Sequence, residues 1–188
     1  DVAALLDAIA TYQRSLLTPG SRFDRWLAGE TDAITPEELA GYQLFKSLGC
    51  VSCHQGVNVG GNLFQRHGIF HQIGSAEPAL VRVPSLRNVA LTAPYNHSGR
   101  FSSLRDATEF YNLGRGHAVP KGEKLTLHWH IWEPRLSSHE INRLVDFLGA
   151  LTDESFKPAV PRKVPSGLKP MPLPAIGNFN KPLTKETP

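Results

Sequence analysis

The sequence predicts a mostly α-helical domain with long loops and an extended, proline-rich tail. Capping signals followed by periodic apolar residues predict helices, strand signals are sparse, and prolines crowd residues 156–188. A chain of 188 residues with 40% hydrophobic residues can build one ordinary core. We therefore expect one domain over residues 1–155 and a separate tail over 156–188.

Two helices are predicted before the segment that holds the cysteines. Residues 2–17 are followed by TPGS, which ends the helix, and they place five apolar side chains on one face: Val2, Leu5, Leu6, Ile9 and Leu16. The next helix begins after Thr35, which acts as N-cap, and Glu38 completes a capping box with it. Gly49 ends this helix, so the chain passes directly from the helix into Cys50.

Two further helices are predicted in the second half of the chain. Residues 103–112 form a short helix that ends before Gly114. The last helix starts at Ser137, with Glu140 in a capping box, and its apolar side consists of Ile141, Leu144, Val145, Leu148 and Leu151. The tail is too rich in proline for a helix or a central strand, so we expect it to wrap the domain or to be partly disordered.

Charge and hydropathy exclude two classes of partner. The net charge is only +3, and Lys and Arg are scattered, whereas a nucleic-acid-binding protein needs a concentrated basic face. No apolar run approaches the roughly 20 residues that cross a bilayer, so we expect no membrane span. The N-terminus lacks the pattern of a signal peptide, and we expect any export signal to lie upstream or to have been removed.

The segment GCVSCHQG, residues 49–56, holds both cysteines of the chain with His54 directly after the second. A disulfide between Cys50 and Cys53 would close a tiny loop and would stabilise weakly. A thioredoxin-like redox pair needs a strand before it and a helix after it, whereas this chain has a helix before the pair and a Gly-rich loop after it. A zinc site needs four ligands, and the chain has no second cysteine pair. The pattern favours covalent haem attachment, in which both thiols join the porphyrin and His54 binds the iron.

This motif also refines the expected fold. A helix that leads into the haem segment, together with an amphipathic helix near the C-terminal end, is typical of a cytochrome c-like domain. Because the haem itself serves as a large apolar core element in such a domain, we expect the chain without haem to be poorly folded.

Three stretches carry a family resemblance: SLLTPGSRFDRWLAGE, GYQLFKSLGCVSCHQGVNVGG and RVPSLRNVALTAPYNHSGRFSSLRDA. Over about residues 1–152 the chain resembles the C-terminal haem domain of bacterial di-haem cytochrome c peroxidases, including their MauG-like branch. The resemblance implies a periplasmic oxidoreductase with two haems, one that reacts with hydrogen peroxide and one that relays electrons. Since this chain has a single CxxCH, it resembles one half, and a second haem domain or chain would be its partner.

The same resemblance suggests ligands for the sixth position of the haem iron. Tyr111 stands where peroxidases of the family have a methionine, and in the MauG-like branch a tyrosine at this position binds the iron. Met171, a histidine or an open site are alternatives, the histidines being His117, His128 and His130. A buried packing role is the ordinary alternative for Tyr111.

Four further residues match functional positions of the family, two near the haem and two at a calcium site. Arg87 would donate to a haem propionate, with a surface salt bridge as the alternative. His97 would support the haem pocket, with an ordinary hydrogen-bonded loop histidine as the alternative. The backbone carbonyl groups of Thr92 and Pro94 would bind a calcium ion between the two domains, because carbonyl oxygens suit hard cations.

The implied function is an exchange of electrons or oxidising equivalents between the peroxide-reactive haem and a redox partner protein or a protein substrate. Two other functions remain open from the residues. One is a stand-alone mono-haem electron carrier without catalysis, and the other is a haem-based gas sensor, which needs a displaceable sixth ligand.

Overall fold

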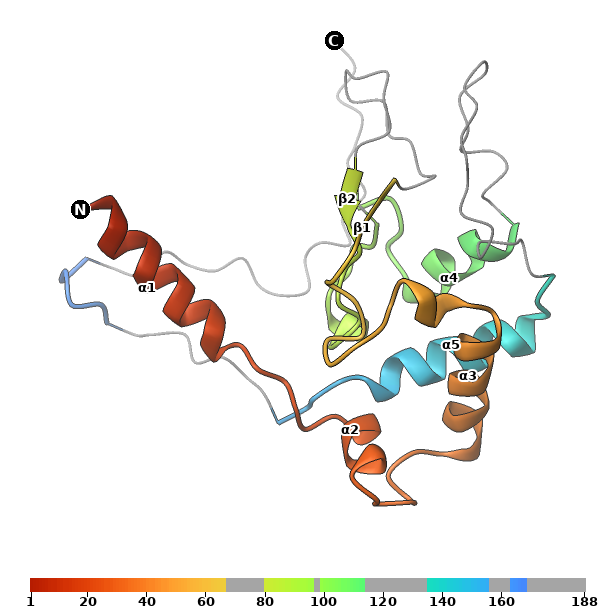
Figure 1. Cartoon of the computed structure of the whole chain (residues 1–188). Coiled ribbons are helices and arrows are strands. Elements are labelled where there is room, and N and C mark those ends of the chain that lie inside the picture. The colour runs from red at the N-terminus through yellow and green to blue at the C-terminus, as the bar shows by residue number, and fades with distance from the viewer. Residues whose placement is uncertain (67–79, 97–98, 114–134, 156–162, 169–188) are drawn as a thin grey trace, which may run out of the picture.

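The computed structural model describes residues 1–66, 80–96, 99–113, 135–155 and 163–168. Its helices and strands are α1 (Val2–Ser15), α2 (Arg22–Leu27), α3 (Pro36–Ser47), η1 (Cys50–Ser52), β1 (Phe64–Arg66), β2 (Leu80–Arg82), η2 (Val89–Leu91), α4 (Leu104–Leu113) and α5 (Ser138–Ala150). The predicted mostly α-helical class is confirmed, as are the four predicted helices (Figure 1).

Capping boxes begin α2, α3 and α5. The two predicted boxes, Thr35 with Glu38 and Ser137 with Glu140, are both present. In α2 the hydroxyl of Ser21 accepts a hydrogen bond from the backbone N–H of Asp24 at 3.1 Å. This short helix was not predicted, although the S-x-x-D pattern at residues 21–24 is the sequence signal of such a box.

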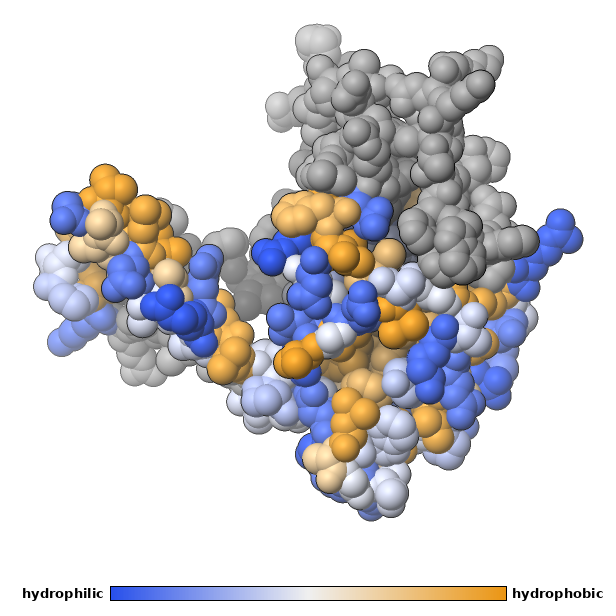
Figure 2. All heavy atoms as spheres, viewed as in Figure 1, coloured by the Kyte–Doolittle hydropathy of each residue, from blue (hydrophilic) through white to orange (hydrophobic). Residues whose placement is uncertain are grey.

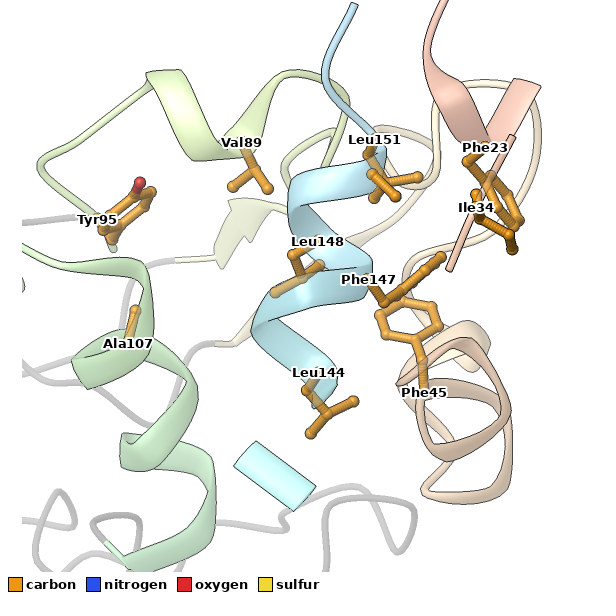
Figure 3. Packing of buried hydrophobic residues seen from close by; sticks show 11 residues of the cluster. Phe23, Ile34, Phe45, Val89, Tyr95, Ala107, Leu144, Phe147, Leu148 and Leu151 are labelled. Carbon is orange, nitrogen blue, oxygen red and sulfur yellow. The ribbon is translucent and has the colours of Figure 1, made fainter. Parts of the chain in front are cut away.

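The core lies where α3 and α5 pack against each other (Figure 3). Phe147 of α5 is 1% exposed and lies between Phe45 of α3 and Phe23 of α2, with ring centroids 5.2 Å from each. The close approach of the two helices depends on Gly41, because a Cβ atom there would lie 1.9 Å from the carbonyl oxygen of Arg143. This helix pair forms the rigid base from which the cysteine segment emerges.

Smaller elements complete the base. The amide group of Asn112 in α4 donates to the Leu136 carbonyl at 3.0 Å and accepts from the Leu136 N–H at 2.7 Å, which ties α4 to the start of α5. Strands β1 and β2 pair antiparallel, with Phe64 opposite Arg82. The sequence showed few strand signals, and this pair of three-residue strands was not predicted.

Helix α1 stands apart from the rest (Figure 1). None of its residues is buried, whereas α2, α3 and α5 all contribute to the core. Within the described segments, no helix is long and apolar enough to cross a membrane.

Candidate haem site

The CxxCH segment folds into one tight turn at the end of α3. Gly49 adopts the left-handed conformation, with φ 77°, which ends the helix and redirects the chain into η1. The backbone N–H groups of Cys53 and His54 both donate to the Cys50 carbonyl oxygen, at 3.3 and 3.0 Å. The turn therefore gathers the two thiols and the imidazole at one place, at the edge of the core.

Neither cysteine forms a disulfide, and both are half-buried. Cys50 packs against the hydrophobic core, and its burial raises the pKa of this thiol to about 11. A reactive redox pair needs a cysteine with a lowered pKa, because the thiolate is the nucleophile. The environment of Cys50 therefore argues against a thioredoxin-like function for the pair.

The imidazole of His54 has one buried edge. Its Nδ1 atom is buried and makes no hydrogen bond of standard geometry within the described residues. Burial lowers the pKa of His54 and outweighs the opposing effect of the Val59 and Pro84 carbonyl groups that face it. The ring is thus neutral at pH 7, and Nε2 is the nitrogen left to bind a metal.

Gly60 allows the backbone to approach this buried edge. It has a φ of 131°, and a Cβ atom there would lie 2.2 Å from the Pro84 carbonyl oxygen and 3.2 Å from His54 Nδ1. A hydrogen bond from the Leu86 N–H to the Val59 carbonyl oxygen, at 3.1 Å, holds the two chain segments together. A residue without a side chain is therefore required where the loop crosses behind His54.

Arg87 ties the loop after His54 to the start of the domain. Its guanidinium makes two hydrogen bonds of 2.8 Å to the Asp24 carboxylate. It also donates to the Val57 carbonyl at 2.6 Å and to the Thr18 carbonyl at 2.9 Å. Burial alone would raise the pKa of Asp24, but the hydrogen bonds from Arg87 and Ser21 lower it below its ordinary value.

These residues fit a covalently attached haem. Two free thiols on one turn would suit the thioether anchors, and a neutral imidazole with its Nδ1 held against backbone carbonyl groups would suit a ligand of the haem iron. Cys50 and Cys53 would hold the ring and His54 would bind the iron. Among the described residues, there is no group of three or more His, Cys, Asp or Glu side chains that could hold a metal ion.

Of the remaining predicted site residues, Tyr111, Thr92 and Pro94 lie within the described part of the chain. Tyr111 lies on α4 with its side chain 40% exposed and its ring edge-on to Phe110, at a centroid distance of 5.6 Å. Thr92 and Pro94 lie on an exposed segment after η2. The roles assigned to Tyr111, Thr92, Pro94 and Arg87 stay predictions. His97 and the alternative ligands His117, His128, His130 and Met171 lie outside the described residues.

Sequence reasoning missed the residues that support His54 and Arg87. The Gly60–Gly61 pair was a visible sign of a close backbone approach, but nothing in the sequence linked it to Pro84. Asp24 was also missed, because it lies far along the chain from Arg87 and only the fold brings the two side chains together.

Comparisons with known proteins agree with this site. Residues 39–152 match the cytochrome c family model, which implies covalent haem c. Cytochrome c551 peroxidase of Nitrosomonas europaea is 42% identical over 57% of this chain and 36% of its own length. The methylamine utilization protein MauG of Paracoccus denitrificans is 31% identical over 82% of this chain and 52% of its own length.

A solved structure shares the fold over the same extent. It is described as a MauG-like protein associated with microbial copper homeostasis, and it matches 82% of this chain and 54% of its own with a TM-score of 0.67 and 28% identity. The chain thus spans about half the length, or less, of these relatives. It belongs to the cytochrome c family and resembles the haem domains of di-haem cytochrome c peroxidases and MauG-like proteins.

Proposed function

We propose that this chain is one haem-bearing half of a periplasmic two-haem oxidoreductase of the peroxidase or MauG-like kind. The observation that carries the proposal is the Cys50–Cys53–His54 turn on a cytochrome c fold, in a chain about half as long as its two-haem-type relatives. Peroxide would react at a haem of the other half. The haem of this chain would relay electrons or oxidising equivalents to a donor or a protein substrate.

The residues of this chain would hold the haem and orient its histidine ligand. The bound haem supplies one-electron chemistry at iron. His54 has its Nδ1 edge buried against backbone carbonyl groups, which leaves Nε2 as the nitrogen that would bind the iron, and the Asp24–Arg87 pair helps to fix the loop that carries those carbonyl groups. An imidazole held in one orientation in this way would suit a haem that relays electrons.

Counting haems tests the proposal directly. The native assembly that contains this chain is purified, and its haem c and protein are quantified together with its rate of peroxide consumption. We expect two haems per assembly and a peroxide-dependent oxidation of a donor. One haem per complete assembly would overturn the proposal in favour of the mono-haem electron carrier.

The sixth ligand of the haem iron distinguishes a simple peroxidase from a MauG-like enzyme. We propose Tyr111, since a hard phenolate stabilises ferric and higher oxidation states and favours oxidation of a protein substrate. Electron paramagnetic resonance and absorption spectra of the ferric protein are compared with those of Tyr111→Phe. A spectrum of tyrosinate ligation that the substitution abolishes supports this ligand, whereas an unchanged spectrum assigns Tyr111 to packing and favours simple peroxide reduction.

A calcium ion between the two halves forms the last part of the proposal. The exposed segment with Thr92 and Pro94 would offer it backbone carbonyl groups. Since the other ligands would come from the second half or from water, calcium should bind the assembly and not this chain alone. Isothermal titration of both forms with calcium checks this, and equal binding to the isolated chain would contradict it.

A further inference from the structure

Helix α1 is amphipathic, and the described part of the chain leaves its apolar side uncovered. We name this side the α1 apolar face; it consists of Val2, Leu5, Leu6, Ile9, Tyr12 and Leu16 at the end of the helix. Leu5 and Leu6 are each 61% exposed. On the other side of the helix, Arg14 forms an ion pair with Asp7 at 3.7 Å and a hydrogen bond with Thr11 at 3.0 Å. Figure 2 shows apolar residues gathered on this projecting helix.

The core does not use this face. The buried cluster draws on α2, α3, α4 and α5 and includes no residue of α1. The matched cytochrome c unit, residues 39–152, also begins after α1. A helix of 14 residues is marginal in water unless an apolar face is packed against something. The α1 apolar face therefore needs a partner outside the cytochrome c unit.

Residues 16–21, which we name the anchored connection, join α1 to the core and are held beside the haem loop, by which we mean residues 49–65 and 81–88. The Thr18 carbonyl accepts from Arg87 at 2.9 Å, and the Gly20 N–H donates to the carboxylate of Asp153 at 2.8 Å. Ser21 is fully buried. Since Arg87 also binds the Val57 carbonyl at 2.6 Å, one side chain joins this connection to the segment after the CxxCH turn.

We propose that the α1 apolar face docks onto the second haem-bearing half, and that the anchored connection holds that half beside the haem loop of this chain. The inference rests on the proposed function, which supplies the second half. The relatives' greater length leaves room for such a unit, because this chain covers only 52 to 54% of the two relatives it matches most extensively here.

A second copy of this chain is a weaker occupant. A 14-residue helix is about 21 Å long and about 10 Å across, so one face offers on the order of 200 Å². Stable interfaces bury about 800 Å² per partner. The face therefore suits one part of a larger contact, such as a neighbouring half that also touches the anchored connection.

Hydrogen–deuterium exchange of the haem-loaded 188-residue chain and of the native assembly tests the docking. In the chain alone we expect the α1 amides to exchange rapidly, and in the assembly we expect exchange roughly 100-fold slower or more. Slow exchange in the chain alone would overturn the proposal, since a segment of this chain or a second copy would then cover the face. Equally fast exchange in both would overturn it as well.

Two matched substitutions localise the contact. Leu6→Glu places a carboxylate on the α1 apolar face, whereas Thr11→Glu places one on the opposite side of the same helix. In the assembly, Leu6→Glu should weaken the association of the two halves, or the protection of the α1 amides, by about tenfold or more, and Thr11→Glu should not. Equal effects of the two substitutions would overturn the docking. It would also be overturned if Leu6→Glu lowered the thermal stability of the isolated chain as much as that of the assembly.

The two proposals can fail separately. Haem counting does not depend on α1, and exchange of the α1 amides does not depend on how many haems the assembly holds. Two haems with an unprotected α1 would remove the docking alone. A protected α1 in an assembly with one haem would remove the two-haem function and show that the partner is not a haem domain. Binding of α1 to vesicles of anionic lipid, abolished by Leu6→Glu, would instead assign the face to a membrane surface.

Discussion

The α3–α5 helix pair buries Phe45, Leu144 and Phe147, whereas the described parts of the following loop, residues 49–65 and 81–88, bury one hydrophobic side chain, Val83. The helix pair is thus held by apolar contact. The loop is held by hydrogen bonds and close backbone approaches, and it surrounds a histidine edge without a standard hydrogen bond. The comparison indicates that apolar packing holds the helix pair, and we expect the loop to depend more strongly on the haem.

Removal of the haem should have the largest effect on stability, and the haem loop should lose its structure first. The substitutions Cys50→Ala and Cys53→Ala together prevent covalent attachment. Because the loop buries so little apolar surface of its own, we expect its protection from hydrogen exchange to be lost and thermal unfolding to lose cooperativity. Near-ultraviolet circular dichroism and hydrogen exchange measure this, and a cooperative, native-like variant would contradict it.

The second prediction concerns the base. Gly41→Ala places a methyl group 1.9 Å from the Arg143 carbonyl oxygen and 2.9 Å from the Phe147 Cβ atom, so the two helices must separate. Overpacking of this kind costs about 1–3 kcal/mol of the free energy of unfolding. Denaturant unfolding of the haem-loaded protein measures the loss.

Gly149→Ala is the matched control in the same helix pair. No atom lies within 4 Å of a Cβ placed at Gly149, which belongs to α5. Alanine has a higher helix propensity than glycine, so this variant should gain about 0.5–1 kcal/mol. A loss at both positions would show that α5 rejects any added methyl group and that the contact at Gly41 has no special role.

The third prediction tests the loop behind His54. Gly60→Ala would press on the Pro84 carbonyl oxygen and on His54 Nδ1, so we expect it to displace the imidazole. The visible absorption spectrum and the reduction potential of the haem should both shift, with a loss of about 1–3 kcal/mol in stability. Gly61→Ala also has a positive φ, of 81°, but meets no atom within 4 Å, so it should lose stability without a spectral change. Identical spectra for both variants would remove Gly60 from the support of His54.

The fold was predictable to the extent that its signals are local. The starts of α3 and α5 were predicted correctly from two capping boxes, Thr35 with Glu38 and Ser137 with Glu140, because a capping box lies within four consecutive residues. The antiparallel pair β1–β2 was missed because three-residue strands have too few residues for alternation to be recognised.

The supports of the site were not predictable, because they are contacts over long sequence distances. His54 meets the Pro84 carbonyl, Arg87 meets Asp24, and the connection after α1 meets Asp153. The apolar periodicity of α1 was recognised, but periodicity shows only that a helix has an apolar face. It does not show whether that face packs within the same chain, and here it does not in the described structure.

The smallest expected effect concerns the Asp24–Arg87 pair and acid. Because the folded-state pKa of Asp24 lies below its ordinary value, near 3.9 in unfolded chains, its ionised form contributes stability above that pH. This contribution is lost as the pH falls through the lower folded-state pKa. We therefore expect Asp24→Asn to be less stable than the unsubstituted protein at pH 6 and to lose less stability when the pH is lowered below about 4.

Denaturant unfolding at a series of pH values measures the difference, and both side chains of the pair are less than one-fifth exposed, at 17% and 18%. Glu30→Gln is the control, because Glu30 forms an ion pair with Arg25 in which both side chains are nearly half exposed, and such pairs contribute little. If the two variants behave alike, Arg87 holds the haem loop only through the Val57 and Thr18 carbonyl groups. In that case Arg87 is linked to the connection after α1 by its hydrogen bond to the Thr18 carbonyl group, and this link should persist at low pH.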